Sequence, residues 1–238
     1  MSTAVPPLGR LATLRRYPVK SLVGETLAGV HVGTRGVEGD RLWSVRDLDG
    51  KLGSGKSTRR FRRMDGLLDL TAAYDGDVPV IGFPDGTRVR GDDEAVHAAL
   101  SAHVGRPVTL AREEDVSHFD DGPLHLVTTA SLRHVSRAHG RVVDPRRLRP
   151  NFVLETEGEG MVEDGWVGTR IALGDELVVE IVQPMPRCVM VDLPQAGLPT
   201  DGGLLRTVTD LNQACLGVLA TVVRPGTVAI GDEARPAP

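Results

Sequence analysis

The chain has 238 residues, a formal net charge of −4 at pH 7, 40% hydrophobic residues and only 3% aromatic residues. This length allows one large all-β or α/β domain, or two smaller domains that share an interface. An acidic chain with few aromatic side chains lacks the positive field and the stacking surfaces of nucleic-acid-binding proteins, so we expect no nucleic-acid partner.

The sequence also argues against membrane insertion and secretion. No stretch reaches the roughly 20 apolar residues of a spanning helix. Residues 1–7 carry no basic flank ahead of a long apolar segment, so they do not resemble a signal peptide. The two cysteines, Cys188 and Cys215, are expected to stay unpaired in a reducing compartment. We therefore predict a cytoplasmic protein with no membrane partner.

Short apolar runs separated by turns dominate the chain. Asp-Gly pairs, which are typical of tight turns between strands, occur at residues 49–50, 75–76, 85–86, 121–122, 164–165 and 201–202. Alternating apolar and polar residues predict half-buried strands over 41–46 and 176–182. Helical periodicity is found over 93–100 and 131–139. These patterns predict a mainly β protein with a few helices.

A change in composition falls between two β-rich halves. Residues 105–117 contain an Arg-Pro pair and the acidic cluster 113–115. We place a domain boundary there, with a first domain over 1–110 and a second over 111–238. The last four residues, 235–238, are expected to form a frayed tail.

Residues 50–57 (GKLGSGKS) match G-x-x-x-x-G-K-[ST], the pattern of a loop that holds nucleotide phosphates on backbone amides. Such a loop follows a buried parallel strand and opens a helix packed on a sheet. Residues 57–64 offer only two side chains to a core, so a buried helix is not expected there. The simpler interpretation is a flexible loop at the end of a hairpin that turns over 47–50. Saturable ATP binding that depends on Lys56 would contradict it.

Cys188 ends the proline-rich segment 183–188 (QPMPRC). Prolines keep this segment out of a regular helix, and the adjacent Arg187 favours the thiolate, the form that attacks electrophiles and binds metals. Free cysteines are also among the most buried residues, so Cys188 alone fits either a presented thiol or a core position. Cys215 lies in a more apolar stretch, and we expect it in the core.

Separated segments along nearly the whole chain resemble the MOSC domain family, in particular the amidoxime-reducing component proteins. In chain order they are 17–21 (YPVKS), 36–41 (GVEGDR), 119–123 (FDDGP), 128–132 (TTASL), 149–152 (RPNF), 163–166 (EDGW), 187–188 (RC), 225–228 (PGTV) and 231–232 (GD). Each segment is weak alone, but their order and spacing together are specific. The resemblance implies a β-barrel MOSC core with a few helices, preceded by an N-terminal β-barrel-like domain.

The resemblance also implies a molybdenum–pterin cofactor (molybdopterin), with Cys188 as the protein thiolate on the metal. A soft anionic sulfur suits a metal already bound by the sulfurs of the pterin dithiolene. The pterin carries a phosphate, which calls for cations and amide-type donors. Cofactor contact is implied for Lys20, Ser21, Arg41, Thr129, Ser131, Arg149, Asn151, Pro186 and Arg187. Without the resemblance, Lys20 and Arg41 are more simply solvated strand residues, and 149–151 is more simply a turn.

Other segments are expected to be structural. The basic run 133–149 lacks interleaved aromatic residues and is expected to form a solvated helix face. Asp164-Gly165 is expected to be a hairpin turn, with Trp166 beginning a strand. Residues 189–197 depart from the family pattern, and Leu219 lies where mitochondrial relatives have a tyrosine near the cofactor, which leaves the substrate open.

The implied function is reduction of N-hydroxylated small molecules, such as hydroxylamines or amidoximes, by a molybdenum-dependent oxidoreductase. Electrons would come from a separate reductase protein, since the chain has no flavin or haem motif and two cysteines cannot hold a Cys₄ iron–sulfur cluster. The alternative is a sulfur-carrier or sulfurtransferase module in which Cys188 holds a persulfide.

Overall fold

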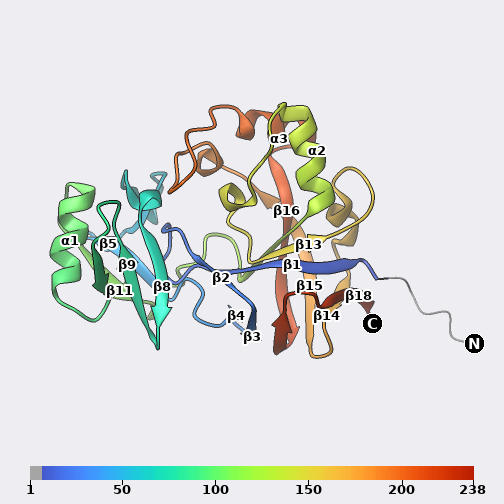
Figure 1. Cartoon of the computed structure of the whole chain (residues 1–238), viewed down its shortest axis with the longest axis horizontal. Coiled ribbons are helices and arrows are strands. Elements are labelled where there is room, and N and C mark those ends of the chain that lie inside the picture. The colour runs from blue at the N-terminus through green and yellow to red at the C-terminus, as the bar shows by residue number, and fades with distance from the viewer. Residues whose placement is uncertain (1–6) are drawn as a thin grey trace, which may run out of the picture.

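The computed structural model describes residues 7–238, which form two β-rich units lying side by side (Figure 1). The prediction about a signal peptide falls on residues outside this range. The described part contains three α-helices and is otherwise mainly β, which confirms the predicted fold class. None of the helices over 7–238 combines the length and apolarity needed to span a bilayer.

Seven strands close into a barrel, at the right of Figure 1. The strands of this sheet are β1 (Gly9–Arg16), β2 (Glu25–Leu27), β12 (Leu124–Thr128), β13 (Phe152–Glu155), β14 (Arg170–Leu173), β15 (Leu177–Pro186), β16 (Cys215–Arg224) and β18 (Glu233–Ala237). Their order is β13-β12-β16-β15-β14-β18-β1, pairing of β1 with β13 closes the barrel, and β2 extends the sheet beyond β1. Apolar side chains such as Leu14, Leu126 and Phe152 fill the interior.

The other unit, called the first unit below, lies at the left of Figure 1. One of its sheets has the order β11-β5-β6-β7 and another has the order β10-β9-β8. Their bounds are β5 (Trp43–Asp47), β6 (Leu52–Ser54), β7 (Phe61–Arg63), β8 (Thr71–Asp75), β9 (Val78–Gly82), β10 (Arg88–Arg90) and β11 (Val108–Arg112), with helix α1 (Ala95–Val104) and the 3₁₀ turn η1 (Leu67–Asp69). The apolar core of this unit is built from residues between Val19 and Leu110.

A small third sheet and two helices complete the fold. The sheet pairs β17 (Gly226–Ala229), β3 (Gly29–Gly33) and β4 (Gly36–Val37). Helices α2 (Thr129–His139) and α3 (Leu204–Asn212) lie over one end of the barrel, at the top of Figure 1. The remaining 3₁₀ turns are η2 (Pro145–Leu148), η3 (Val162–Trp166) and η4 (Val189–Val191). A third apolar cluster, which includes Leu132, Val135 and Val208, packs α2 and α3 onto the barrel.

The locally patterned elements are where the sequence predicts them. The helices over 93–100 and 131–139 are α1 and α2, and the strands over 41–46 and 176–182 are β5 and β15. The hairpin turn over 47–50 is also confirmed, because the amide of Asp47 donates to the carbonyl of Lys51 at 3.1 Å.

Three local predictions are wrong, each because of a distant contact. Residues 235–237 belong to β18, whose pairing with β14 and β1 helps to close the barrel. Asp164-Gly165 and Trp166 lie in η3, because the buried Glu163 carboxylate accepts hydrogen bonds from Thr128 and Ser131 and holds this turn at the start of α2. Arg147 is buried, not solvated, and donates to the carbonyls of residues 191, 193 and 199.

The chain crosses between the units more than once. It begins in the barrel with β1, builds the first unit as far as β11, and returns to the barrel at β12. The division into domains over 1–110 and 111–238 stays a prediction.

Candidate functional site

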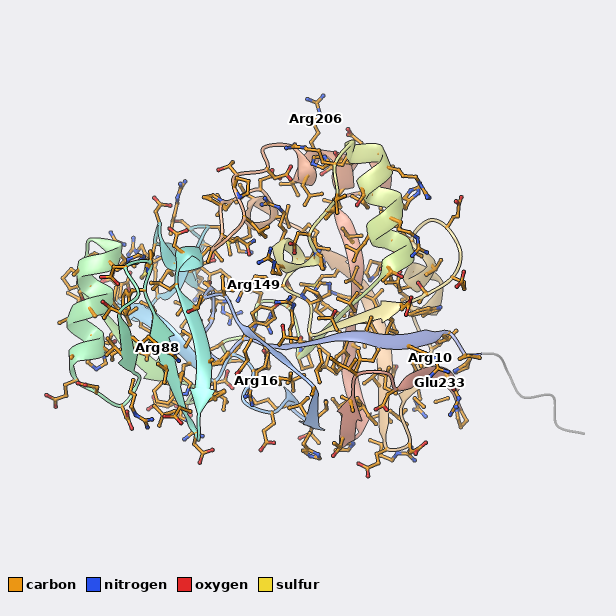
Figure 2. All side chains as sticks on the ribbon, in the orientation of Figure 1. Arg10, Arg16, Arg88, Arg149, Arg206 and Glu233 are labelled. Atoms are coloured by element: carbon orange, nitrogen blue, oxygen red, sulfur yellow. The ribbon has the colours of Figure 1, made fainter. Side chains whose placement is uncertain are left out.

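A cavity of about 190 Å³ lies between the first unit and the barrel, around Cys188. Eight of the ten residues implied as cofactor or metal contacts line it: Lys20, Ser21, Arg41, Arg149, Asn151, Pro186, Arg187 and Cys188. Arg149 lies at the junction between the two units (Figure 2). Lys20 and Cys188, which are 168 positions apart in sequence, therefore meet at one site.

Thr129 and Ser131 do not line this cavity. Thr129 accepts a hydrogen bond from the amide of Thr156 at 3.0 Å, and Ser131 donates to the buried carboxylate of Glu163. The amide of Ser131 also donates to Thr128, which caps α2. Both side chains are thus engaged in holding the start of the helix against its neighbours.

Several lining residues were not predicted from the sequence. They are Ser54, Lys56, Asp120, Asp121, Gly122, His125, Arg147, Leu148, Met185, Met190 and Val191. Two of them, Ser54 and Lys56, belong to the segment that matches the phosphate-loop pattern. Leu219, noted for its place in the family pattern, also lines the cavity. Asp120, Asp121 and Gly122 lie in the family-like segment 119–123, but nothing in the sequence shows that the others share a cavity, since they come from several separate turns, loops and strand ends.

The lining is strongly cationic although the chain as a whole is acidic. It contains six Lys and Arg side chains and two carboxylates, those of Asp120 and Asp121. The Lys20 side chain is 2% exposed, and its Nζ lies 2.9 Å from Oδ1 of Asp120, in an ion pair that is not aligned as a hydrogen bond. Burial lowers the pKa of Lys20 to about 8, and Asp120 partly opposes that shift. The charge of this lining suits an anion.

Tyr17 supports two of these cations. The guanidinium carbons of Arg149 and Arg41 lie 4.3 and 4.7 Å from the centroid of its ring. Arg41 also pairs with Asp40, and its Nη2 donates to the carbonyl of Arg149 at 3.3 Å. Burial lowers the pKa of Arg149 to about 10. Both guanidinium groups therefore hold fixed positions before any ligand binds.

Three residues of the lining have the backbone conformation that favours glycine. Ser21, Arg41 and Arg149 have φ values of 65°, 52° and 54°. An L-residue in this left-handed region costs roughly 1–2 kcal/mol, which a glycine would avoid. Non-glycine residues in such conformations cluster at functional sites, and here all three line one cavity.

Arg187 fixes the wall of the cavity. Its Nε donates to the carbonyl of Leu216 at 2.9 Å, its Nη1 to the carbonyl of Leu148 at 2.9 Å, and its Nη2 to Nε2 of His125. Burial lowers the pKa of Arg187 to about 9. Because most of its donors are engaged by the protein, Arg187 mainly joins three segments around Cys188.

Asn151 has a similar supporting role. Its Oδ1 accepts a hydrogen bond from the amide of His125 at 3.2 Å, and its Nδ2 donates to the carbonyl of Arg15 at 3.3 Å. The side chain is 1% exposed. Asn151 thus ties the loop after η2 to β12 and β1.

The two thiols differ in position. Cys188 is half-buried in the lining, directly before η4. Cys215 is also half-buried, at the start of β16 and paired with Pro186, so its predicted place in the core is wrong. A turn with two left-handed residues, Gln213 and Ala214, brings it to this strand end. Within residues 7–238, no three His, Cys, Asp or Glu side chains gather as a metal-binding group.

Two buried donors of the lining, His125 Nδ1 and Arg149 Nη2, have no hydrogen-bond acceptor. They are among seven buried side-chain atoms in the described part of the chain that lack an aligned hydrogen bond, and a third, Lys20 Nζ, has only its ion pair with Asp120. The Nε2 atom of His125 accepts from Arg187, so the ring proton is on Nδ1. Burial and the charge of Arg187 hold the pKa of His125 well below its ordinary value, and the ring is neutral. Unsatisfied buried donors are costly, so this cavity is suited to a ligand rich in acceptors.

Comparison with known proteins identifies related sequences and folds. Residues 85–235 match the family model of the MOSC domain, and residues 8–101 match that of the MOSC N-terminal beta barrel domain. The chain is similar to the YuaD protein from Bacillus subtilis, with 14% identity over 95% of this chain and 93% of that one and a TM-score of 0.51. YiiM from Geobacillus stearothermophilus, at 14% identity, covers 49% of this chain and 54% of its own with a TM-score of 0.38. No curated protein matches the sequence.

Proposed function

The chain belongs to the MOSC domain family, which is named for the C-terminal domain of molybdenum cofactor sulfurase, and we propose that it binds a molybdenum–pterin cofactor around Cys188. The observation that carries this proposal is the donor set of one cavity. It combines a half-buried thiol with buried cations and two donors, His125 Nδ1 and Arg149 Nη2, that lack an acceptor. A phosphate and a pterin ring supply acceptors of the matching kind.

The residues divide into ligands and supports. Cys188 would bind the metal, because a thiolate suits a metal that already has sulfur ligands. Lys20, Arg41 and Arg149 would donate to the phosphate and the pterin. Ser21 donates to the carbonyl of Gly53 at 3.0 Å and can still accept one bond from a ligand.

We further propose that the enzyme reduces N-hydroxylated small molecules. The cofactor, when bound, supplies the two-electron chemistry that cleaves an N–O bond. The N–OH group takes up two electrons and two protons, and the products are N–H and water. The protein holds the cofactor, orients the substrate beside it and limits the access of water. A separate reductase protein would supply the electrons.

Metal analysis of one variant tests the cofactor. The full chain is produced in a host that makes the pterin, as wild type and as Cys188→Ser and Cys215→Ser. We expect roughly stoichiometric molybdenum in the wild type and in Cys215→Ser, whose thiol does not line the cavity. Cys188→Ser should lose the metal, together with reduction of an amidoxime by a reduced dye. Equal molybdenum content in Cys188→Ser and Cys215→Ser would contradict the assignment of Cys188 as the metal ligand.

The sulfur-carrier alternative uses the same thiol. It predicts cyanide-labile sulfur on wild-type protein that contains no molybdenum, with loss of that sulfur in Cys188→Ser. Molybdenum content and labile sulfur are measured on the same preparations. The two functions are therefore separated by one set of samples.

A further inference from the structure

The loop between β6 and β7 faces the cavity, although no helix follows it. Ser54 and Lys56, from the segment GKLGSGKS, line the same cavity as Cys188. The loop leads directly into β7, and β7 pairs parallel with β6. The backbone therefore lacks the strand-to-helix geometry of a nucleotide-binding loop. The presence of Lys56 in the cavity lining needs a different explanation.

The loop is held firmly against the barrel side of the cavity. The amide of Gly55 donates to Sδ of Met190 at 3.2 Å. A Cβ at Gly55 would lie 2.4 Å from that sulfur and 2.5 Å from Cδ1 of Leu193, so only glycine allows this approach. On the other side of the loop, Thr58 Oγ1 accepts hydrogen bonds from the amides of residues 60 and 61, each at 3.2 Å. Lys56 therefore has a defined position, facing the segment that follows Cys188.

Lys56 lies in an excess of positive charge. Its Nζ is 5.4 Å from the centroid of the Phe61 ring, and Lys20 Nζ and the guanidinium carbon of Arg60 are 4.5 and 5.2 Å from the same point. The nearby carboxylate of Asp120 forms its ion pair with Lys20. Within residues 7–238, no carboxylate oxygen lies within 4.0 Å of Lys56 Nζ, the distance that defines an ion pair. An added anion would reduce the repulsion among these cations.

Lys56 also remains accessible to a small molecule. Lys20 is 2% exposed, whereas Lys56 is half-buried. We propose that Lys56 forms an anion-binding subsite that recognises a carboxylate or phosphate group on the substrate. The reaction with that substrate rests on the proposed function, but anion binding at Lys56 does not. The phosphate of the cofactor is the competing anion for Lys56.

Three variants test the subsite on the full chain. Lys56→Met removes the charge, Lys56→Arg keeps it, and Arg59→Met removes one equal charge from an exposed position of the same loop that does not line the cavity. Benzoate binding is followed by NMR for each protein. We expect Lys56→Met to weaken binding about tenfold, the loss of one charge-assisted contact, with Lys56→Arg and Arg59→Met close to wild type. Equal affinity in Lys56→Met, or no binding to the wild type, overturns the subsite.

Two further measurements separate the sources of the anion. Molybdenum and pterin content should be equal in wild type and Lys56→Met, since a fall would assign Lys56 to the cofactor phosphate and overturn the substrate role. The ratio of kcat/KM for a carboxylated aryl amidoxime to that for its neutral parent should fall about tenfold in Lys56→Met. An unchanged ratio also overturns that role. If no protein reduces either amidoxime while benzoate binding still depends on Lys56, the reductase function fails and the subsite stands.

Discussion

Arg41 and Arg149 lie 108 positions apart in the chain, and both place their guanidinium groups over the ring of Tyr17. Arg41 comes from the first unit and Arg149 follows η2, so the ring joins the two sides of the cavity. The Tyr17 hydroxyl donates to the carbonyl of Pro150 at 3.2 Å. The tyrosine thus fixes two cations from different parts of the fold.

Replacing that ring should impair cofactor binding. In Tyr17→Leu the two guanidinium groups lose their shared support, and we expect molybdenum content to fall several-fold in protein that remains folded by circular dichroism. The matched control is Tyr74→Leu. Tyr74 also carries an arginine over its ring, Arg16 at 4.5 Å, and donates to a backbone carbonyl, but Arg16 does not line the cavity, whereas Arg41 and Arg149 do. Similar molybdenum content in the two variants would show that the ring has no special role.

The left-handed backbone at Arg149 predicts an unusual order of stabilities. We expect Arg149→Gly to be more stable than Arg149→Ala by about 1 kcal/mol, because alanine keeps the strain that glycine relieves. At Arg146, in η2, the order should reverse, with alanine about 1 kcal/mol more stable than glycine. Urea unfolding of the four variants measures both differences. Both variants at 149 should lose molybdenum equally, since both lack the guanidinium group.

Stability should rise with pH above about 8 because of Lys20. Burial lowers its pKa to about 8 in the folded protein, from an ordinary value of 10.5. Between these values the unfolded chain binds the proton and the folded protein does not, so the free energy of unfolding increases with pH. The full separation corresponds to about 3 kcal/mol. Below pH 8 both states hold the proton, and this contribution to the slope disappears.

Two variants isolate the Lys20 contribution. Urea unfolding at pH 7 to 10 should show a steeper rise for wild type than for Lys20→Met. In Asp120→Asn the rise should begin at a lower pH, because the Asp120 carboxylate raises the pKa of Lys20. Parallel pH profiles for wild type and Lys20→Met would refute the assignment.

Gly55 is closely packed, so we expect its substitution to destabilise the protein more than substitution of a glycine that has free space around it. In Gly55→Val the new side chain must displace Met190 and Leu193, and we expect a loss of about 1–3 kcal/mol of unfolding free energy. Both neighbours meet it with flexible side-chain ends, so the loop should shift without unfolding the protein. The control is Gly33→Val, since a Cβ at Gly33 meets nothing within 4 Å. Its unfolding free energy should stay within about 0.5 kcal/mol of wild type.

Short-range patterns predicted the elements that depend on nearby residues. The alternation over 41–46, the helical period over 131–139 and the turn over 47–50 each concern neighbours in sequence, and each is present. The tail over 235–238 was wrong because pairing with β14 depends on residues more than 60 positions away. Local pattern cannot report such a partner.

The candidate site could likewise be predicted only in part from the sequence. The segments around Lys20, Arg41, Arg149 and Cys188 were identified in the sequence through their order and spacing, and the fold brings them to one cavity. Thr129 and Ser131 lie outside this cavity because of contacts made only in the folded chain: Ser131 donates to the carboxylate of Glu163, and Thr129 accepts from the amide of Thr156.

The amino-acid sequence by itself determined the β-rich fold class and the family resemblance, because these depend on residue types and their spacing along the chain. Only the tertiary structure decided that Cys188 and Lys56 line one cavity, that Arg187 is engaged by backbone carbonyls, and that two buried donors lack an acceptor. Whether a donor is satisfied depends on atoms that distant segments bring within about 3 Å, and no local pattern contains that distance.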